Sequence, residues 1–215
     1  MKLTRYGKKE ILLAVLLSAF FSLLFCFIYL PLILLPVLCC LFVLFFFRDP
    51  RRNVPEDSDL FVSPADGRVV AVDVAEENTY IQSKSKRVCI FLSLTNVHLN
   101  RIPCAGTIEK IVYTPGKFLN ALRNRSSVEN ENNLVGIRSS GGMKVSVKQI
   151  AGTIARRIVC ELKPGDRKKT GETFGMIKFG SRTEIYLPES ETIEILVTPG
   201  QKVLAGETII ARLKS

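Results

Sequence analysis

The sequence predicts a mainly β protein: an antiparallel, barrel-sandwich-like domain with repeated hairpins, preceded by an N-terminal hydrophobic helical hairpin. Three observations support this class. Residues 11–47 contain no charged side chain. Residues 60–215 consist of short runs rich in Val and Ile, separated by Gly and Pro, as in strands joined by turns. Three segments of that region also share one order: a strand-like run, Pro-Gly, polar residues and a return.

The apolar segment 11–47 is too long for one straight helix across a bilayer. Such a helix would measure roughly 55 Å, whereas the hydrocarbon core is about 30 Å thick. Pro31 and Pro36 offer a turn between two short helices, 11–29 and 33–47. A cleaved signal peptide fits less well, because its apolar region is about 7–15 residues long. We therefore expect residues 1–47 to anchor the chain in a membrane, either crossing it or lying in its interface.

Basic residues surround this segment, and the formal net charge of the 215-residue chain is +10. The turn between the two expected helices carries none. By the positive-inside tendency, both ends of the hairpin and everything after Arg48 lie in the cytoplasm at the cell membrane. Flanking charge of this kind suits anionic lipid. Nucleic acid is not an expected partner, since no basic run alternates with aromatic residues. The flanking basic residues are Lys2, Arg5, Lys8, Lys9, Arg48, Arg51 and Arg52.

Residues 48–59 are polar, include Pro50 and Pro55, and form the expected juxtamembrane linker. The β-rich domain is expected over 60–215, with 116–124 as its only short helix. Its repeated segments begin at Gly106, Gly152 and Glu191. The expected strands are 68–74, 87–94, 106–113, 144–152, 155–162, 174–180, 183–188, 192–197 and 208–213.

The six cysteines and the single histidine do not form a metal-ligand pattern. No two cysteines have C-x-x-C spacing, so no metal is expected. We interpret the cysteines as reduced, mostly buried small hydrophobes in a reducing compartment. They are Cys26, Cys39, Cys40, Cys89, Cys104 and Cys160.

Gly180-Ser181, in "MIKFGSRTEIYLP", follows an alternating strand-like run. Glycine within a strand usually marks a bulge, which is the structural interpretation. The chemical interpretation makes this peptide bond a reactant. His98 would act as general base on the Ser181 hydroxyl, with Asp66 orienting its ring. Both also have structural explanations: His98 is flanked by apolar residues, and Asp66 lies in the turn sequence Pro-Ala-Asp-Gly.

Attack of the Ser181 hydroxyl on the Gly180 carbonyl would exchange the amide for an ester. β-Elimination would then cut the chain and leave a dehydroalanine, which hydrolyses to an N-terminal pyruvoyl group. This ketone can form a Schiff base with a primary amine and accept the electrons left by departing CO2, a task that pyridoxal phosphate performs elsewhere.

A series of motifs along nearly the whole chain resembles the short, prokaryotic phosphatidylserine decarboxylase proenzymes. They are "FFRDP", "SPADGRV", "NVHLNRIPCAGTIEKIVYTPGKFLNA", "ENENN", "QIAGTIARRI" and "FGMIKFGSRTEIYLP". The resemblance implies a pyruvoyl-dependent carboxy-lyase that converts phosphatidylserine to phosphatidylethanolamine and CO2. It further implies cleavage between Gly180 and Ser181, giving chains 1–180 and 181–215 that stay together as a heterodimer. Ser181 then becomes the covalent pyruvoyl cofactor, and Asp66 and His98 match positions associated with self-processing.

Three basic residues are candidates for binding the phosphate or carboxylate of this substrate, because Arg pairs with either group through two hydrogen bonds. They are Arg101, Lys117 and Arg182, with Arg123 and Arg125 nearby. Each is equally explained as a solvated charge. The apolar residues Phe118, Leu119 and Leu122 either enter the membrane interface or face the core.

Two other functions fit parts of the sequence. The repeated hairpins also occur in biotinyl and lipoyl carrier domains, and Met143-Lys144 resembles a biotin acceptor turn, so a membrane-tethered carrier modified on Lys144 is one alternative. The other is a decarboxylase of an ether-linked, archaeal-type serine phospholipid, whose headgroup is the same.

Overall fold

The computed structural model describes the chain except residues 1, 124, 154–156, 179 and 215. It forms two compact units, residues 1–51 and 52–215. The boundary falls inside the segment expected to be a linker.

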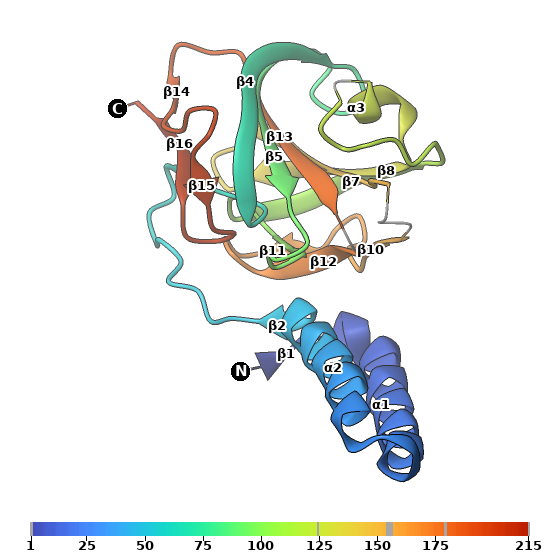
Figure 1. Cartoon of the computed structure of the whole chain (residues 1–215). Coiled ribbons are helices and arrows are strands. Elements are labelled where there is room, and N and C mark those ends of the chain that lie inside the picture. Colours follow the sequence, from blue (N-terminus) through green and yellow to red (C-terminus); the bar gives the residue numbers. More distant parts are fainter. Residues whose placement is uncertain (1, 124, 154–156, 179, 215) are drawn as a thin grey trace. The chain divides into compact units, whose positions relative to one another are not determined.

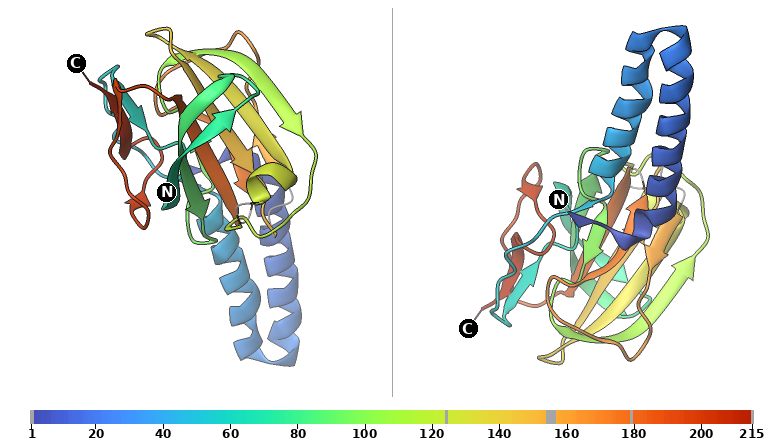
Figure 2. Two further views of the ribbon diagram at one scale, coloured as in Figure 1. Left: turned by 90° about the horizontal axis from the view of Figure 1, so that it is seen from above. Right: turned by 90° about the horizontal axis from the view of Figure 1, so that it is seen from below.

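The first unit is a pair of packed helices (Figure 1, Figure 2). The helices α1 (Lys8–Ile28) and α2 (Leu34–Phe46) are joined by a 3-10 turn, η2 (Leu30–Ile33), which confirms the two predicted helices. Pro31 lies at the start of η2, and Pro36 lies in the first turn of α2, where its missing N–H has no intrahelical acceptor to lose. A short β pair closes the unit: β1 (Lys2–Leu3) is antiparallel to β2 (Arg48–Asp49), with the 3-10 turn η1 (Arg5–Gly7) after β1.

The helix α1 is apolar on all sides and none of its residues is buried. Together with η1 it is long and apolar enough to cross a membrane, whereas α2 is shorter. Apolar side chains exposed in this way indicate association with a membrane.

The second unit is antiparallel β structure in three sheets, which confirms the mainly β class. Eight strands form one strongly curled sheet in the order β11-β7-β8-β9-β13-β5-β4-β15 (Figure 1). Three-stranded sheets of order β10-β12-β6 and β14-β16-β3 complete it. The strands are β3 (Leu60–Val62), β4 (Gly67–Glu77), β5 (Ser83–Leu92), β6 (Leu99–Arg101), β7 (Gly106–Thr114), β8 (Asn132–Ser139), β9 (Lys144–Ile150), β10 (Arg157–Cys160), β11 (Arg167–Lys168), β12 (Thr173–Lys178), β13 (Ser181–Pro188), β14 (Ile193–Ile195), β15 (Lys202–Val203) and β16 (Ile209–Leu213).

One face of the curled sheet packs on the main hydrophobic core. Successive side chains of a strand point to opposite faces. Along β13, Ile185 and Leu187 join this core, whereas Arg182, Glu184 and Tyr186 lie on the other face. All five are buried: Ile185 and Leu187 lie in the core, Ser127 contacts Glu184, and Tyr186 packs with Tyr80, Ile81 and Leu134.

Within their described residues, the three repeated segments do not fold as separate hairpins. In the first, β7 pairs with β8 and β11 from outside the segment. In the second, β10 pairs with β12 and β11 pairs with β7; in the third, β14 pairs with β16 and β15 pairs with β4. What these two segments share is the Pro-Gly turn, in which Gly165 and Gly200 have φ values of 94° and 95° that favour glycine. The second segment includes residues 154–156, which lie outside the described part.

The prediction of a helix over 116–124 is also wrong, because the described residues 116–123 are not helical. The only α-helix described in the second unit is α3 (Ser126–Glu129). Residues 117–119 instead lie beside 129–131: Lys117 N–H donates to the Glu129 carbonyl at 2.7 Å, and Leu119 N–H donates to Asn130 Oδ1 at 2.9 Å. These long-range partners satisfy the backbone of the segment without a helix.

Candidate active site

Gly180 and Ser181 lie where the chain passes from one sheet to another. The strand β12 belongs to a three-stranded sheet and ends at Lys178, and Ser181 begins β13 at the centre of the curled sheet. Gly180 has φ +59°, a left-handed conformation that favours glycine. The pair is therefore the crossing point between sheets and not a bulge inside one strand. Phe179, which precedes it in the motif, lies outside the described residues.

His98 contacts Gly180 directly. The Gly180 N–H donates to His98 Nε2 at 3.1 Å, and His98 Nδ1 lies 3.0 Å from the Asn96 carbonyl oxygen. A carbonyl only accepts and an amide N–H only donates, so the proton of the neutral ring is on Nδ1 and the lone pair on Nε2. This is the tautomer that a general base at Nε2 needs. The ring is fully buried.

The Ser181 hydroxyl is buried, and its oxygen has no hydrogen-bond partner within the described residues. Buried hydroxyls are normally paired, so this unpaired hydroxyl beside the left-handed Gly180 is a candidate nucleophile. The carbonyl of Gly180 lies against Gly152, where a Cβ would stand 2.1 Å from the oxygen. Glycine at 152 therefore makes room for the carbonyl that the Ser181 hydroxyl would attack, and these residues fit the formation of a pyruvoyl group.

Asp66 has different partners from those expected. Both of its oxygens accept from Arg52 Nη2, at 2.9 and 2.7 Å, and Oδ1 also accepts from the Ala205 N–H at 2.7 Å. The Asn96 carbonyl contacts Nδ1 of His98. The expected bond between Asp66 and His98 is not among the described contacts: Asp66 joins residue 52 to the turn at 205, which lies in the expected small chain, and its role in processing stays a prediction.

A pocket of about 240 Å³ opens beside Gly180. Phe91 and Leu94 form an apolar part of its wall, and Asn120 and Ala121 contribute a wall from the loop that precedes α3. Its size suits a small polar headgroup. Among the described residues, the lining is Phe91, Ser93, Leu94, Asn120, Ala121, Thr153 and Gly180.

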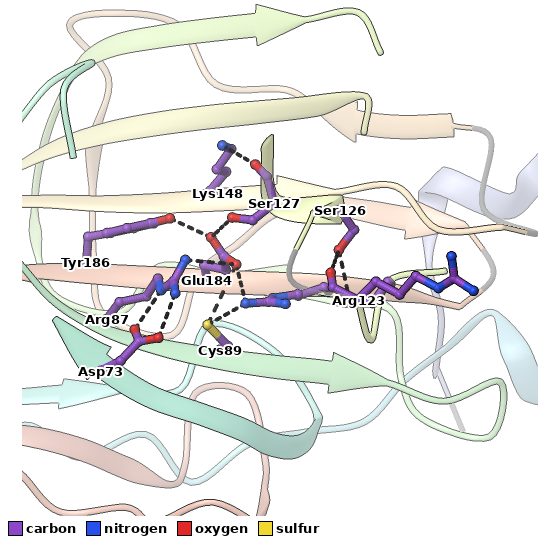
Figure 3. A network of polar contacts seen from close by, with 11 residues as sticks. Asp73, Arg87, Cys89, Arg123, Ser126, Ser127, Lys148, Glu184 and Tyr186 are labelled. Atoms are coloured by element: carbon purple, nitrogen blue, oxygen red, sulfur yellow. Dashed lines mark hydrogen bonds and ion pairs between the residues drawn. The ribbon is translucent and has the colours of Figure 1, made fainter. Parts of the chain in front are cut away.

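Arg182, next to the cleavage position, is buried and paired inside the protein. Its Nη2 lies 2.7 Å from Glu184 Oε1 and 2.8 Å from Cys89 Sγ. Glu184 Oε2 accepts from Ser127 Oγ at 2.8 Å and from the Tyr186 hydroxyl at 2.5 Å (Figure 3). This network fastens α3, and with it the loop that carries Asn120 and Ala121, to the reactive strand.

Burial in this network shifts the pKa values of its members. Loss of hydration raises the pKa of the Cys89 thiol to about 12, with the Glu184 carboxylate adding to the effect. Burial likewise raises the pKa of Tyr186 above its ordinary value. Lys148 donates to the Ser127 carbonyl at 2.7 Å, and burial lowers its pKa.

The other basic candidates do not converge with Arg182. Arg101 Nη1 donates to the Gly171 carbonyl at 3.0 Å. Lys117 and Arg125 are exposed and pair with Glu129 at 2.9 and 2.6 Å. Arg123 is exposed, and its carbonyl accepts from Ser126 Oγ at 2.6 Å (Figure 3).

Two further expectations concern the carrier alternative and the cysteines. Lys144 begins β9, and its Nζ donates to the Tyr80 carbonyl at 3.2 Å, so it is not an acceptor at the tip of a turn.

All six cysteines are free thiols, and Cys89 and Cys104 are buried, but Cys26 and Cys39 are exposed on the first unit. Within the described residues, no three acidic, Cys or His side chains group as metal ligands.

Sequence reasoning did not identify Gly152, Asn96 or Glu184. The glycine of "QIAGTI" was a signal for Gly152, since a glycine between strand-like runs can mark a close backbone approach. Asn96 acts through its backbone carbonyl and Glu184 lies in an ordinary alternating strand, so neither has a local signature.

The family model of phosphatidylserine decarboxylase matches residues 40–211. The chain is 50% identical to the phosphatidylserine decarboxylase proenzyme of Carboxydothermus hydrogenoformans, over 84% of each chain. It is 45% identical to that of Rhodopirellula baltica over 97% of this chain and 87% of the relative, and 42% identical to that of Desulfotalea psychrophila over 82% of each. The chain therefore belongs to the phosphatidylserine decarboxylase family.

Proposed function

We propose that this chain is a proenzyme that cuts itself between Gly180 and Ser181 and then converts phosphatidylserine to phosphatidylethanolamine with release of CO2. The observation that carries this is the unpaired, buried Ser181 hydroxyl beside a left-handed Gly180 whose N–H is bonded to His98. Family membership supplies the reaction class.

Self-cleavage begins when Ser181 Oγ bonds to the Gly180 carbonyl carbon and the C–N bond between the two residues breaks. His98 Nε2 gives up its hydrogen bond with the Gly180 N–H, takes the hydroxyl proton and passes it to the departing Ser181 nitrogen. The resulting ester undergoes β-elimination: a base removes the Cα proton of Ser181, the Cβ–Oγ bond breaks and Gly180 leaves as a carboxylate. The dehydroalanine then hydrolyses with loss of ammonia to the pyruvoyl terminus.

When formed, the pyruvoyl group supplies an electron sink for decarboxylation of an amino acid headgroup. The described residues hold the substrate for it. The pocket beside Gly180 receives the headgroup, and Phe91 and Leu94 exclude water from its apolar part. Lys117 and Arg101 remain candidates for anion binding by charge, whereas the burial of Arg182 favours a role inside the sheet.

The two chains stay together after the cut because the small one supplies a central strand. β13 pairs with β5 on one side and with β9 on the other, and β14, β15 and β16 also belong to residues 181–215. Separation would break all of these ladders. The active species is therefore a heterodimer of 1–180 and 181–215.

Residues 1–47 anchor this enzyme in the cell membrane, with the catalytic domain on the cytoplasmic side. Exposed apolar side chains along α1 and the basic residues at both ends of the hairpin support this. Resistance to extraction by alkaline carbonate tests the anchor. Digestion of residues 48–215 by protease in inverted but not in right-side-out vesicles tests the orientation.

Intact-mass measurement of the purified protein tests the processing. A proenzyme that has matured gives two chains in place of one of 24.0 kDa, and the small one shifts in mass with hydroxylamine. An active preparation that remains one chain and ignores hydroxylamine contradicts the proposal. CO2 release from ester-linked and ether-linked serine phospholipids distinguishes the two substrate classes.

A further inference from the structure

We propose that a second pocket, formed by β4, β15 and the turn 93–96, is an anion subsite that binds the phosphodiester of the substrate headgroup. This inference rests on the proposed function and adds a recognition site to it. The pocket has a volume of about 400 Å³. The described residues that line it are Gly67, Arg68, Phe91, Ser93, Thr95, Asn96, Lys202, Val203 and Leu204, and none of these is a carboxylate.

Two cations face each other in this pocket. Arg68 on β4 is the cross-strand partner of Lys202 on β15, so both side chains lie on one face of the sheet. Like charges directly opposite destabilise an antiparallel pair. Neither forms an ion pair within the described residues: Arg68 Nη1 donates to the Gly200 carbonyl at 2.6 Å, and Lys202 is exposed. A bound anion would remove this repulsion and accept hydrogen bonds from both groups.

The turn 93–96 contributes one neutral donor, the Asn96 amide. Ser93 N–H and Ser93 Oγ both donate to Asn96 Oδ1, at 2.9 and 2.7 Å, which orients the Asn96 amide so that its NH2 group is left for another acceptor. Because the Ser93 hydroxyl donates to Asn96, the Thr95 hydroxyl donates to Ser93 Oγ at 3.1 Å. Two cations with the Asn96 amide NH2 form a donor set that suits a phosphate group.

This pocket adjoins the one beside Gly180, because Phe91 and Ser93 line both. Cross-strand pairing also connects this pocket to the reactive strand. Lys202 pairs with Arg68, Arg68 with Phe91, and Phe91 with Arg182. Neighbouring strands lie about 4.8 Å apart, which places β4 about 10 Å from β13. In a serine phospholipid the phosphate is only a few bonds from the amine and carboxylate, so one headgroup can occupy both pockets.

The test compares Arg68→Gln/Lys202→Gln with Lys163→Gln/Lys169→Gln in the full-length, processed protein. The control removes the same charge from exposed residues that line neither pocket. Intact mass first establishes that both variants are cut, so failure of processing is recognised as failure of the proposed function. The substrates are a short-chain, monomeric phosphatidylserine and O-methylserine, which lacks the phosphate.

We expect the KM for the short-chain lipid to rise about tenfold or more in the Arg68/Lys202 variant, as for loss of charged hydrogen bonds, with kcat little changed. Turnover of O-methylserine should not change. Arg68→Lys should restore part of the affinity relative to Arg68→Gln. Equal KM values in the variant, the control and the wild type would overturn the proposal.

Binding of inorganic phosphate, measured by calorimetry, is a readout independent of activity. The wild type should bind phosphate, and glycerophosphoserine should displace it, whereas the Arg68/Lys202 variant should bind neither. Phosphate binding that glycerophosphoserine does not displace identifies a site for free phosphate and overturns the assignment to substrate. An effect seen only on vesicles containing phosphatidylglycerol, and not with the short-chain lipid, identifies a membrane-surface contact and also overturns it.

Discussion

Gly152 and the Gly180 carbonyl are in such close contact that a Cβ on Gly152 would stand 2.1 Å from the Gly180 oxygen. No side chain fits there without moving the carbonyl that Ser181 attacks. Residue 152, distant in sequence from the cleavage bond, therefore fixes the position of the electrophile.

Gly152→Ala should slow self-cleavage strongly, because even a small misplacement of reacting atoms lowers the rate by about a hundredfold. Gly141→Ala is the control, since a Cβ there meets only Ser139 Oγ at 3.9 Å. Conversion of the 24.0 kDa chain into two is followed by gel electrophoresis after synthesis. Cleavage of Gly152→Ala at the rate of the control would show that the contact does not position the carbonyl.

Ser181→Ala should abolish both cleavage and decarboxylation, because no hydroxyl remains to attack Gly180 or to yield the ketone. Ser146→Ala is a matched control: its hydroxyl is also buried and without a partner in the described structure, but it lies on β9. We expect that control to process fully. A cut at residue 180 in Ser181→Ala, detected by mass spectrometry, would refute the mechanism.

His98→Ala should slow processing by about 10²–10⁴-fold, the usual contribution of a general base. The measurement is the half-life of the uncut chain, with circular dichroism used to verify that the variant is folded. Normal maturation of a folded His98→Ala protein would reduce His98 to a packing residue.

Glu184→Ala should destabilise the second unit by about 3–5 kcal/mol, because Arg182 then becomes a buried charge without its counter-ion. Ser127→Ala removes only one hydrogen bond to the same carboxylate and should lose about 2 kcal/mol. Urea unfolding of the full chain in detergent measures both.

The double variant Arg182→Met/Glu184→Leu distinguishes the buried charge from simple loss of packing. It should recover much of the lost stability, because replacing both ions of a buried pair by apolar side chains is often neutral. A double variant no more stable than Glu184→Ala would contradict the role assigned to the unpaired guanidinium.

Cys104→Ala should weaken the dependence of stability on alkaline pH. Burial raises the pKa of the Cys104 thiol from 9.0 to about 12. A group with a raised pKa in the folded state stabilises it below the unfolded pKa, and this contribution is lost as pH rises from about 9 to 12. The decline of the urea midpoint between pH 9 and 10 should be smaller in Cys104→Ala than in Cys39→Ala, whose thiol is exposed.

The division of the chain into apolar helices and a β domain was determined by the sequence itself. Uncharged residues over 11–47 and the alternating runs that follow are local patterns, and most of the expected strands are present. β8 (Asn132–Ser139) was not expected, because Asn132, Asn133 and Gly136 are poor strand residues. They are tolerated there because Asn133 donates to Gln149 Oε1 at 2.9 Å and the Tyr80 ring packs where a Cβ of Gly136 would stand.

The candidate reactive residues could also be predicted from short stretches of sequence, since Gly180-Ser181 and the only histidine carry recognisable functional groups. The tertiary structure decided how they meet: the bond between Gly180 and His98, the pairing of Asp66 with Arg52, and the burial of Arg182 against Glu184. Whether a charged side chain binds substrate or a counter-ion depends on which strands become neighbours. That choice is set by pairing between distant segments, and no pattern within one segment encodes it.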